Sequence, residues 1–141
     1  MTAAVVDASV WVSATDGSEP HHAESAACLL RLSELGWRVV VPSLARLEVA
    51  CVLARQFRNP GQARRITAGL LQAARAVEVP LDAGAVERAQ LIGTERYLRG
   101  ADAVYAAEAA SASMTLISWD DELIKRAGAV SPTAWLRANA Q

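Results

Sequence analysis

Short apolar runs alternate with longer stretches of helical periodicity along this chain. A short continuous apolar run is typical of a buried strand, whereas apolar residues at every third or fourth position indicate a helix. Apolar runs predict strands at Ala3–Val6 and residues 38–41, and Val77–Val79 and Thr115–Ser118 are two further short strand candidates. Helical spacing predicts helices at Ala8–Ser13, His21–Leu35, Gly61–Ala74, Gly84–Leu98, Ala103–Ala112 and Thr133–Asn139. The alternation predicts an α/β domain with a parallel sheet of four to five short strands between helices.

Two prolines mark element boundaries in this pattern. Pro42 follows the second strand, and Ser43 is placed to cap a helix that begins at Leu44. Near the end of the chain, Ser131 followed by Pro132 matches a capping residue with proline at the first helical position. Both sites predict an abrupt transition into a helix.

Length and composition favour one folded domain spanning residues 1–141. A chain of 141 residues is long enough for one substantial core and too short for two. Hydrophobic residues make up 52% and charged residues 21%, which is typical of globular proteins. The net charge of −1 gives no overall attraction to a polyanion, so nucleic-acid binding would need a local basic surface.

Targeting and redox features predict a cytoplasmic protein that does not associate with membranes. The N-terminus has no basic leader, and no apolar stretch reaches the ~18 residues that a membrane span needs. Cys28 and Cys51 lie in apolar helical patterns without the spacing of a zinc or redox motif. We interpret both as buried thiols in a reducing compartment.

Three aspartates lie next to predicted helix starts. Asp7 and Asp120 each follow a predicted strand and precede a helix, and Asp102 lies in the first turn of a helix. Each position has a purely structural interpretation, because aspartate commonly caps free backbone N–H groups there. Asp121 and Glu122 directly follow Asp120, and their negative charges could interact favourably with the dipole at the start of the helix there.

Glu48 is different because helical spacing places it on a face that is expected to point into the core. It shares an arc with four apolar residues, Leu44, Leu47, Cys51 and Val52. A buried carboxylate needs a partner, which is either an arginine such as Arg55 or a bound cation.

Taken together, the acids predict a site for hard cations. The carboxyl ends of parallel strands meet at one edge of a sheet, and ligands bind there where the strand order reverses. Close carboxylates repel one another, and all-oxygen ligation favours Mg²⁺ or Mn²⁺ over zinc. The only histidines, His21 and His22, are adjacent in a predicted loop and are expected to be exposed.

The acidic motifs resemble those of the PIN-domain ribonucleases, particularly the VapC-type toxins of type II toxin–antitoxin systems. In chain order the motifs are Val-Val-Asp7-Ala-Ser9, Leu-Glu48-Val-Ala, Arg-Gly-Ala-Asp102-Ala and Leu-Ile-Ser118-Trp-Asp120, and they span nearly the whole sequence. The resemblance implies a three-layer α/β/α domain and the hydrolysis of RNA phosphodiester bonds by metal-activated water. It also implies that Asp7, Glu48, Asp102 and Asp120 hold Mg²⁺ or Mn²⁺ and that Ser9 and Ser118 support them.

The same resemblance implies partners. A VapC-like toxin has a cognate antitoxin that covers the acidic site, and the family commonly forms homodimers. Arginines concentrated between residues 46 and 75 offer a local basic surface for RNA or antitoxin, at Arg55, Arg58, Arg64 and Arg65. Alternatively, these arginines only form the solvent-exposed face of a helical hairpin and bind no partner. We expect the four tryptophans to be buried in core or dimer contacts rather than to bind substrate.

Three other functions are compatible with parts of the pattern. A phosphotransfer or receiver domain would also carry an aspartate after its first strand, but a second acid is missing beside Asp7. A catalytically silent interaction module could keep the fold and bind a partner through its arginines. A housekeeping RNA-processing nuclease would share the acids, although the bare domain favours a toxin.

Overall fold

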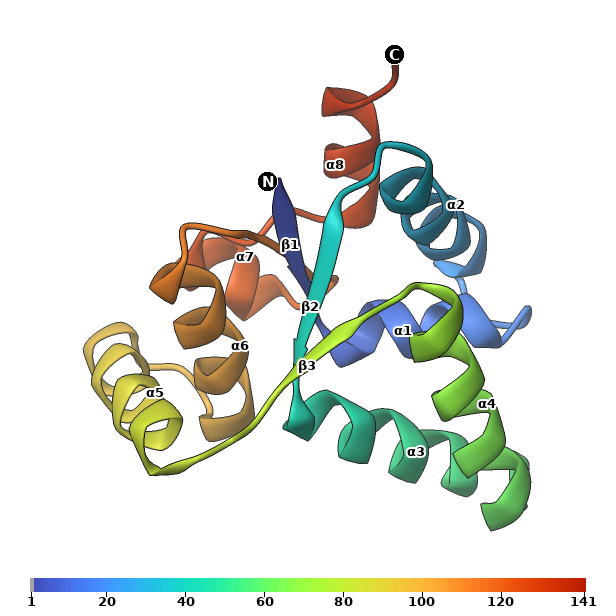
Figure 1. The fold of residues 1–141 in the computed structure, drawn as a ribbon, viewed down its shortest axis with the longest axis horizontal. Coiled ribbons are helices and arrows are strands. Elements are labelled where there is room, and N and C mark those ends of the chain that lie inside the picture. The colour runs from blue at the N-terminus through green and yellow to red at the C-terminus, as the bar shows by residue number, and fades with distance from the viewer. Residues whose placement is uncertain (1) are drawn as a thin grey trace.

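The computed structural model describes residues 2–141 as a four-stranded parallel sheet with helices on both faces (Figure 1). The strands are β1 (Ala3–Val6), β2 (Arg38–Pro42), β3 (Val77–Val79) and β4 (Thr115–Ile117). Their order across the sheet is β3-β2-β1-β4, and β1 pairs in parallel with both β2 and β4. The predicted three-layer α/β/α architecture is confirmed.

The helices follow the strands in the predicted alternation. They are α1 (Ala8–Thr15), α2 (His22–Glu34), α3 (Ser43–Phe57), α4 (Pro60–Ala73), α5 (Ala83–Arg96), α6 (Gly100–Ser111), α7 (Asp121–Ala127) and α8 (Pro132–Ala138). In Figure 1, α5 and α6 lie to the left of the strands and α1, α2 and α4 lie to the right. None of these helices combines the length and the apolar character that crossing a bilayer requires.

The predicted helix starts lie within one residue of the observed ones, except for the helix that carries Asp102. The helix after β2 begins at Ser43 rather than Leu44, and the Ser43 hydroxyl donates to the carbonyl oxygen of Val79 instead of capping the helix. The helix that carries Asp102 begins at Gly100 rather than Ala103. The predicted cap at Ser131 is confirmed, because its side chain accepts from the backbone N–H of Ala134 at 3.1 Å.

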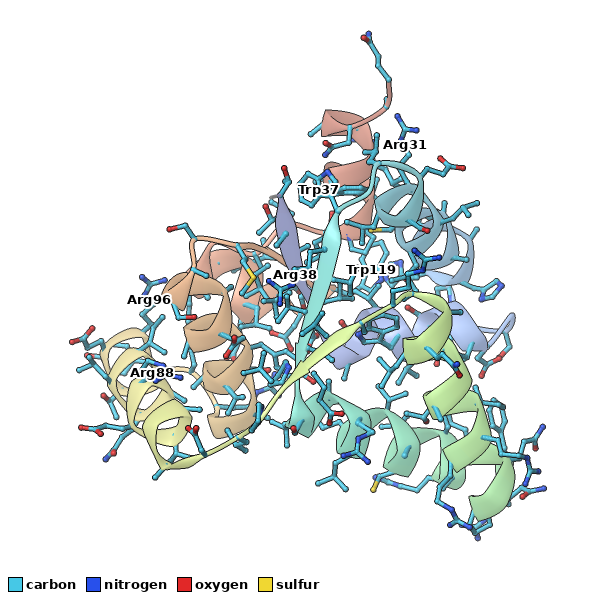
Figure 2. The ribbon with its side chains drawn as sticks, viewed as in Figure 1. Arg31, Trp37, Arg38, Arg88, Arg96 and Trp119 are labelled. Atoms are coloured by element: carbon cyan, nitrogen blue, oxygen red, sulfur yellow. The ribbon has the colours of Figure 1, made fainter. Side chains whose placement is uncertain are left out.

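The core lies between the sheet and the two helical layers, and aromatic residues anchor it. Trp11 is fully buried, and its ring N–H donates to the carbonyl oxygen of Val6 at 3.0 Å. Trp37 packs edge to face against the buried Trp135, with ring centroids 5.1 Å apart, and lies beside α8 in Figure 2. Within residues 2–141, the expectation that the tryptophans serve packing is thus confirmed for these three.

The buried face of α3 differs from the predicted one. Ala45, Val49 and Leu53 form the buried stripe at a spacing of four residues, whereas Leu47 is 61% exposed and Cys51 is exposed. The prediction failed because it took the larger apolar side chains as markers of the core, while a small alanine and a valine make the closer packing. Of the two cysteines, only Cys28 is buried, and burial raises the pKa of its thiol to about 12.

Helices α5 and α6 pack closely where Gly93 faces Ala103. A Cβ atom at Gly93 would lie 2.7 Å from the Cβ of Ala103, which no packed pair tolerates without a shift. We therefore expect Gly93→Ala to lower the free energy of unfolding by about 1–3 kcal/mol. Gly69→Ala in α4 is the matched control, because nothing lies within 4 Å of the added Cβ there, and it should gain up to about 1 kcal/mol. Urea denaturation measures both, and equal effects in the two variants would contradict the close packing.

Candidate metal centre at the carboxyl ends of the strands

The acidic residues gather where the strand order reverses. From β1 the chain proceeds to β2 on one side, whereas β4 lies on the other side of β1. Asp7 directly follows β1, and Asp120 lies three residues beyond the end of β4. This reversal point is the place in an open parallel sheet where ligands bind, as the sequence predicted.

Asp7 is buried and held by two hydroxyl groups rather than serving as a helix cap. Its Oδ2 accepts from Ser9 Oγ at 2.7 Å and from Ser118 Oγ at 2.8 Å, and its side chain makes no capping hydrogen bond to α1. The capping interpretation is therefore wrong for Asp7. The hydroxyl of Ser118 also accepts from the backbone N–H of Asp120, so it links the ends of β1 and β4.

Asp120 does cap a helix, but only with one of its oxygens. Oδ1 accepts from the backbone N–H groups of Glu122 and Leu123 at 2.9 and 3.1 Å. Oδ2 is left for another partner and accepts from Arg99 Nη2 at 2.7 Å. The structural and functional interpretations of Asp120 are thus compatible, because the two oxygens face different groups.

Glu48 reaches toward the same acids from α3. Its Oε1 accepts from the hydroxyl group of Tyr105 at 2.6 Å, and the proposed pair with Arg55 is absent from the described residues. Tyr105 lies one turn after Asp102 on α6 and is buried. Burial and then the hydrogen bond to Glu48 raise the pKa of Tyr105 well above its ordinary value, so the hydroxyl remains a donor.

Glu122, which the sequence suggested only as a residue that interacts with the helix dipole, belongs to the acidic cluster. Oxygen atoms of Asp102, Asp120 and Glu122 lie within 4.8 Å of one another, a spacing that could hold a metal ion. Glu122 follows Asp120 by two residues, in the first turn of α7, which is the only signal for it in the sequence. Asp121 between them is exposed and lies outside this group.

Electrostatics couples Asp7 and Glu48 to this group. Burial raises the pKa of Glu48, and the charges of Asp7 and Asp102 add to the effect while the Tyr105 hydrogen bond opposes it. Burial likewise raises the pKa of Asp102; the hydrogen bond from Arg99 opposes this and the nearby charge of Asp120 reinforces it. Glu48 and Asp102 therefore lie close enough to neighbouring carboxylates for those charges to disfavour their own negative charge.

This donor set suits a hard divalent cation. Carboxylate oxygens from the three-residue cluster, with Asp7 and Glu48 at the same edge of the sheet, are the ligands that Mg²⁺ and Mn²⁺ prefer. No cysteine or histidine belongs to the cluster, so zinc is a poor match. A cation would also relieve the repulsion between the acids, which adds to the effect of burial on the pKa values of Glu48 and Asp102.

A hollow of about 390 Å³ opens beside these acids. It is lined by residues of α1, α3 and the segments before α2 and α7, among them Ser9, Glu48, Glu19, Gln56, His21 and Trp119. His21 stacks on Trp119 with centroids 3.7 Å apart, and the Trp119 ring N–H donates to Ser25.

The two histidines differ in their surroundings. His21 is exposed as predicted. His22 begins α2, is half-buried and contacts the carbonyl oxygen of Ser13, so the prediction of a loop is wrong for His22.

The predicted basic surface is exposed on α3, α4 and the turn between them. Its members Arg55, Arg58, Arg64 and Arg65 form no ion pair within the described residues. Of the neighbouring arginines, Arg46 pairs with Glu78 at 2.9 Å. Four guanidinium groups are thus available to a polyanion or an acidic protein.

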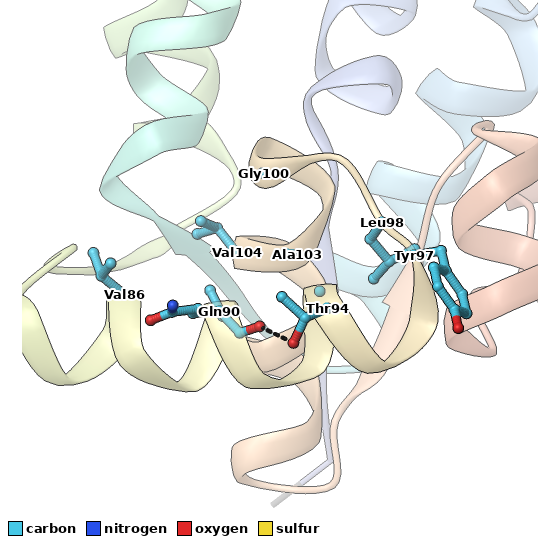
Figure 3. Close-up of a pocket in the computed structure, with 10 residues that line it drawn as sticks. Val86, Gln90, Thr94, Tyr97, Leu98, Gly100, Ala103 and Val104 are labelled. Carbon is cyan, nitrogen blue, oxygen red and sulfur yellow. Dashed lines mark hydrogen bonds between the residues drawn. The ribbon is translucent and has the colours of Figure 1, made fainter.

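A larger hollow, of about 530 Å³, lies away from the acids, between α5 and α6 (Figure 3). Its lining is mostly apolar and includes Val86, Leu98 and Val104, and it holds no charged residue. The dashed line in Figure 3 is the hydrogen bond from Thr94 Oγ1 to the carbonyl oxygen of Gln90, at 2.8 Å. This surface lacks the groups that hydrolysis would need.

Comparison with known proteins identifies the family. The model of the PIN domain matches residues 4–129, and the chain belongs to the PIN domain family. No curated protein matches the sequence.

Solved structures from several organisms share the fold. A protein from Pyrobaculum aerophilum aligns with a TM-score of 0.71 and 22% identity, over 99% of this chain and 96% of that one. The toxin VapC20 of Mycobacterium tuberculosis, described as cleaving the sarcin–ricin loop, aligns with a TM-score of 0.73 and 20% identity, over 91% and 97%. A toxin–antitoxin complex from Klebsiella pneumoniae contains a chain with a TM-score of 0.68 and 18% identity, over 92% and 98%.

Proposed function

We propose that this protein is a Mg²⁺- or Mn²⁺-dependent endoribonuclease and the toxin of a toxin–antitoxin pair of the VapC type. The observation that carries the proposal is the carboxylate cluster at the point of strand reversal in a PIN domain. The structural similarity to VapC20 and to the chain from the Klebsiella pneumoniae complex supports the toxin assignment.

The cations would be held by Asp102, Asp120 and Glu122, with Asp7 and Glu48 completing the acidic edge. A bound divalent ion lowers the pKa of its water toward neutrality and stabilises negative charge on a phosphodiester. The chain itself supplies the orientation. Ser9 and Ser118 fix the Asp7 carboxylate, and other contacts described above fix Glu48 and one oxygen of Asp120, so these carboxylates themselves need little reorientation when a cation enters.

RNA would approach along surfaces next to the acids. In this proposal the hollow lined by Glu48 and Trp119 would receive a nucleotide beside the scissile phosphate. The arginines of α3 and α4 would contact more distant phosphates or an acidic segment of the antitoxin. A homodimer and an antitoxin that covers the acidic edge belong to the same proposal.

Metal-dependent cleavage of a mixed RNA pool by the purified protein tests this function. We expect cutting with Mg²⁺ or Mn²⁺ and none with EDTA, with activity restored when the metal is added back. Because an unseen substrate preference could hide activity, the pool should contain structured ribosomal and transfer RNA as well as unstructured RNA. Failure to cut any of these, by folded protein free of antitoxin, would instead favour a silent binding module.

A further inference from the structure

Arg99 of the chain itself occupies the position of a cation in the acidic cluster. Its Nη2 donates to Asp120 Oδ2 at 2.7 Å and its Nε donates to Asp102 Oδ2 at 3.0 Å. The same Nε lies 3.6 Å from an oxygen of Glu122. These are the three carboxylates whose spacing could hold a metal ion.

A guanidinium group and a divalent ion would compete for these oxygens. Both are positively charged, and each needs the carboxylate oxygens within direct contact distance. Two cations sharing the same small group of oxygens would repel each other strongly in a partly buried setting. Entry of a divalent ion is therefore favoured when the Arg99 side chain moves away.

Nothing else in the described residues holds the Arg99 side chain in place. Its hydrogen bonds go only to Asp102 and Asp120, and the side chain is 66% exposed. The residue itself is fixed, because it is the N-cap position of α6 and has an extended backbone. A released guanidinium would stay tethered at the edge of the acidic site and would lose little packing, because most of the side chain is exposed.

We propose that Arg99 is an internal cation that neutralises the acidic cluster without metal, is displaced by the divalent ion and then binds a phosphate of the RNA. The inference rests on the proposed function. A guanidinium is suited to both positions, since its planar array of donors matches carboxylate and phosphate oxygens alike. Binding linkage is reciprocal, so a side chain that the metal displaces must also weaken the binding of that metal.

The first test is the affinity for Mn²⁺ without RNA, measured by isothermal titration calorimetry on wild type, Arg99→Gln and Arg96→Gln. Arg96 is the matched control, because it lies three residues away, is exposed and forms no ion pair in the described residues. We expect Arg99→Gln to bind Mn²⁺ about tenfold more tightly and Arg96→Gln to remain within about twofold of wild type. Equal affinity in wild type and Arg99→Gln would overturn the competition.

The second test separates displacement from a static ion pair. In ¹⁵N spectra of the side chains, the Nε–H signal of Arg99 should shift as Mg²⁺ is added, because its carboxylate partners are lost. A purely structural pair would leave this signal unchanged, and Arg99→Gln would then lower stability without tightening Mn²⁺ binding. That combination would also overturn the inference.

The third test addresses the phosphate. At saturating Mn²⁺, Arg99→Gln should raise the KM for RNA severalfold. This KM should depend no more steeply on the concentration of metal or salt than the KM of wild type does. Arg99→Lys should recover part of the loss. An unchanged KM would overturn the phosphate contact. Failure of the proposed function looks different, because a wild-type protein that bound no Mn²⁺ at all would refute the metal centre itself.

Discussion

Asp102→Asn is expected to reduce metal-dependent RNA cleavage by about a hundredfold or more, since removing even a supporting group of a metal site costs about 10–100-fold. The substitution keeps the shape of the side chain and removes one negative oxygen from the three-residue cluster. Burial raises the pKa of Asp102, so a neutral amide should not destabilise the metal-free protein. Cleavage rates with Mn²⁺, alongside circular dichroism to confirm folding, measure the effect.

Asp121→Asn provides the control for this prediction. Asp121 lies in the first turn of α7, directly after Asp120, but is exposed and outside the cluster. Its removal changes the net charge by the same amount and should leave cleavage close to wild type. Mn²⁺ should raise the melting temperature of wild type and Asp121→Asn, and do so much less for Asp102→Asn. A folded Asp102→Asn protein that cuts as fast as wild type would refute the role of the cluster.

Local patterns were sufficient to predict the fold and the edge of the sheet at which the acids meet. Strands β1, β2 and β4 contain short apolar runs bounded by a polar residue or a proline, and these signals lie within a few neighbouring positions, whereas β3 is Val-Glu-Val. The parallel arrangement follows from the alternation with helices, and it brings Asp7 and Asp120 to one edge whatever the packing details. The buried face of α3 was harder to predict, because the small Ala45 is buried while the larger Leu47 is exposed.

Ser9 and Ser118 were expected beside the acids from the family resemblance, whereas Tyr105 and Arg99 could not be predicted as partners because they contact acids from distant parts of the chain. Tyr105 donates to Glu48 across 57 positions, and Arg99 donates to Asp120 across 21. Only the spacing of three residues between Arg99 and Asp102 leaves a trace in the sequence, and such pairs are common on ordinary helix surfaces. A pair becomes informative only when the tertiary fold adds a second and a third carboxylate to the same guanidinium.

Hydrogen-bond partners from the chain also hold the carboxylates of the acidic edge in place. Asp7 receives two hydroxyl hydrogen bonds, Asp120 receives two backbone N–H groups and Glu48 receives the Tyr105 hydroxyl. Hydrogen bonds to charged groups are stronger than those between neutral groups, so they offset part of the repulsion between the acids. The fold itself thus contributes to the orientation of these carboxylates.

Ser118→Ala tests this support directly and should weaken both folding and metal binding. The Ser118 side chain is fully buried, donates to Asp7 and accepts from the backbone N–H of Asp120. Alanine leaves that N–H without its partner and leaves Asp7 with Ser9 alone. We expect the free energy of unfolding to fall by about 1–3 kcal/mol in urea denaturation. Mn²⁺ affinity should fall by about 10–100-fold, because the group that orients Asp7 is lost.

Ser111→Ala is the matched control, since Ser111 is exposed and its hydroxyl donates only to the carbonyl oxygen of Glu108 within α6. Surface changes of this kind usually alter stability by less than about 0.5 kcal/mol. A Ser118→Ala protein with the stability of the control but weaker Mn²⁺ binding would show that the hydroxyl serves metal binding and not folding. If stability fell while Mn²⁺ affinity stayed at the wild-type value, Ser118 would be a packing residue, and Asp7 would be oriented well enough by Ser9.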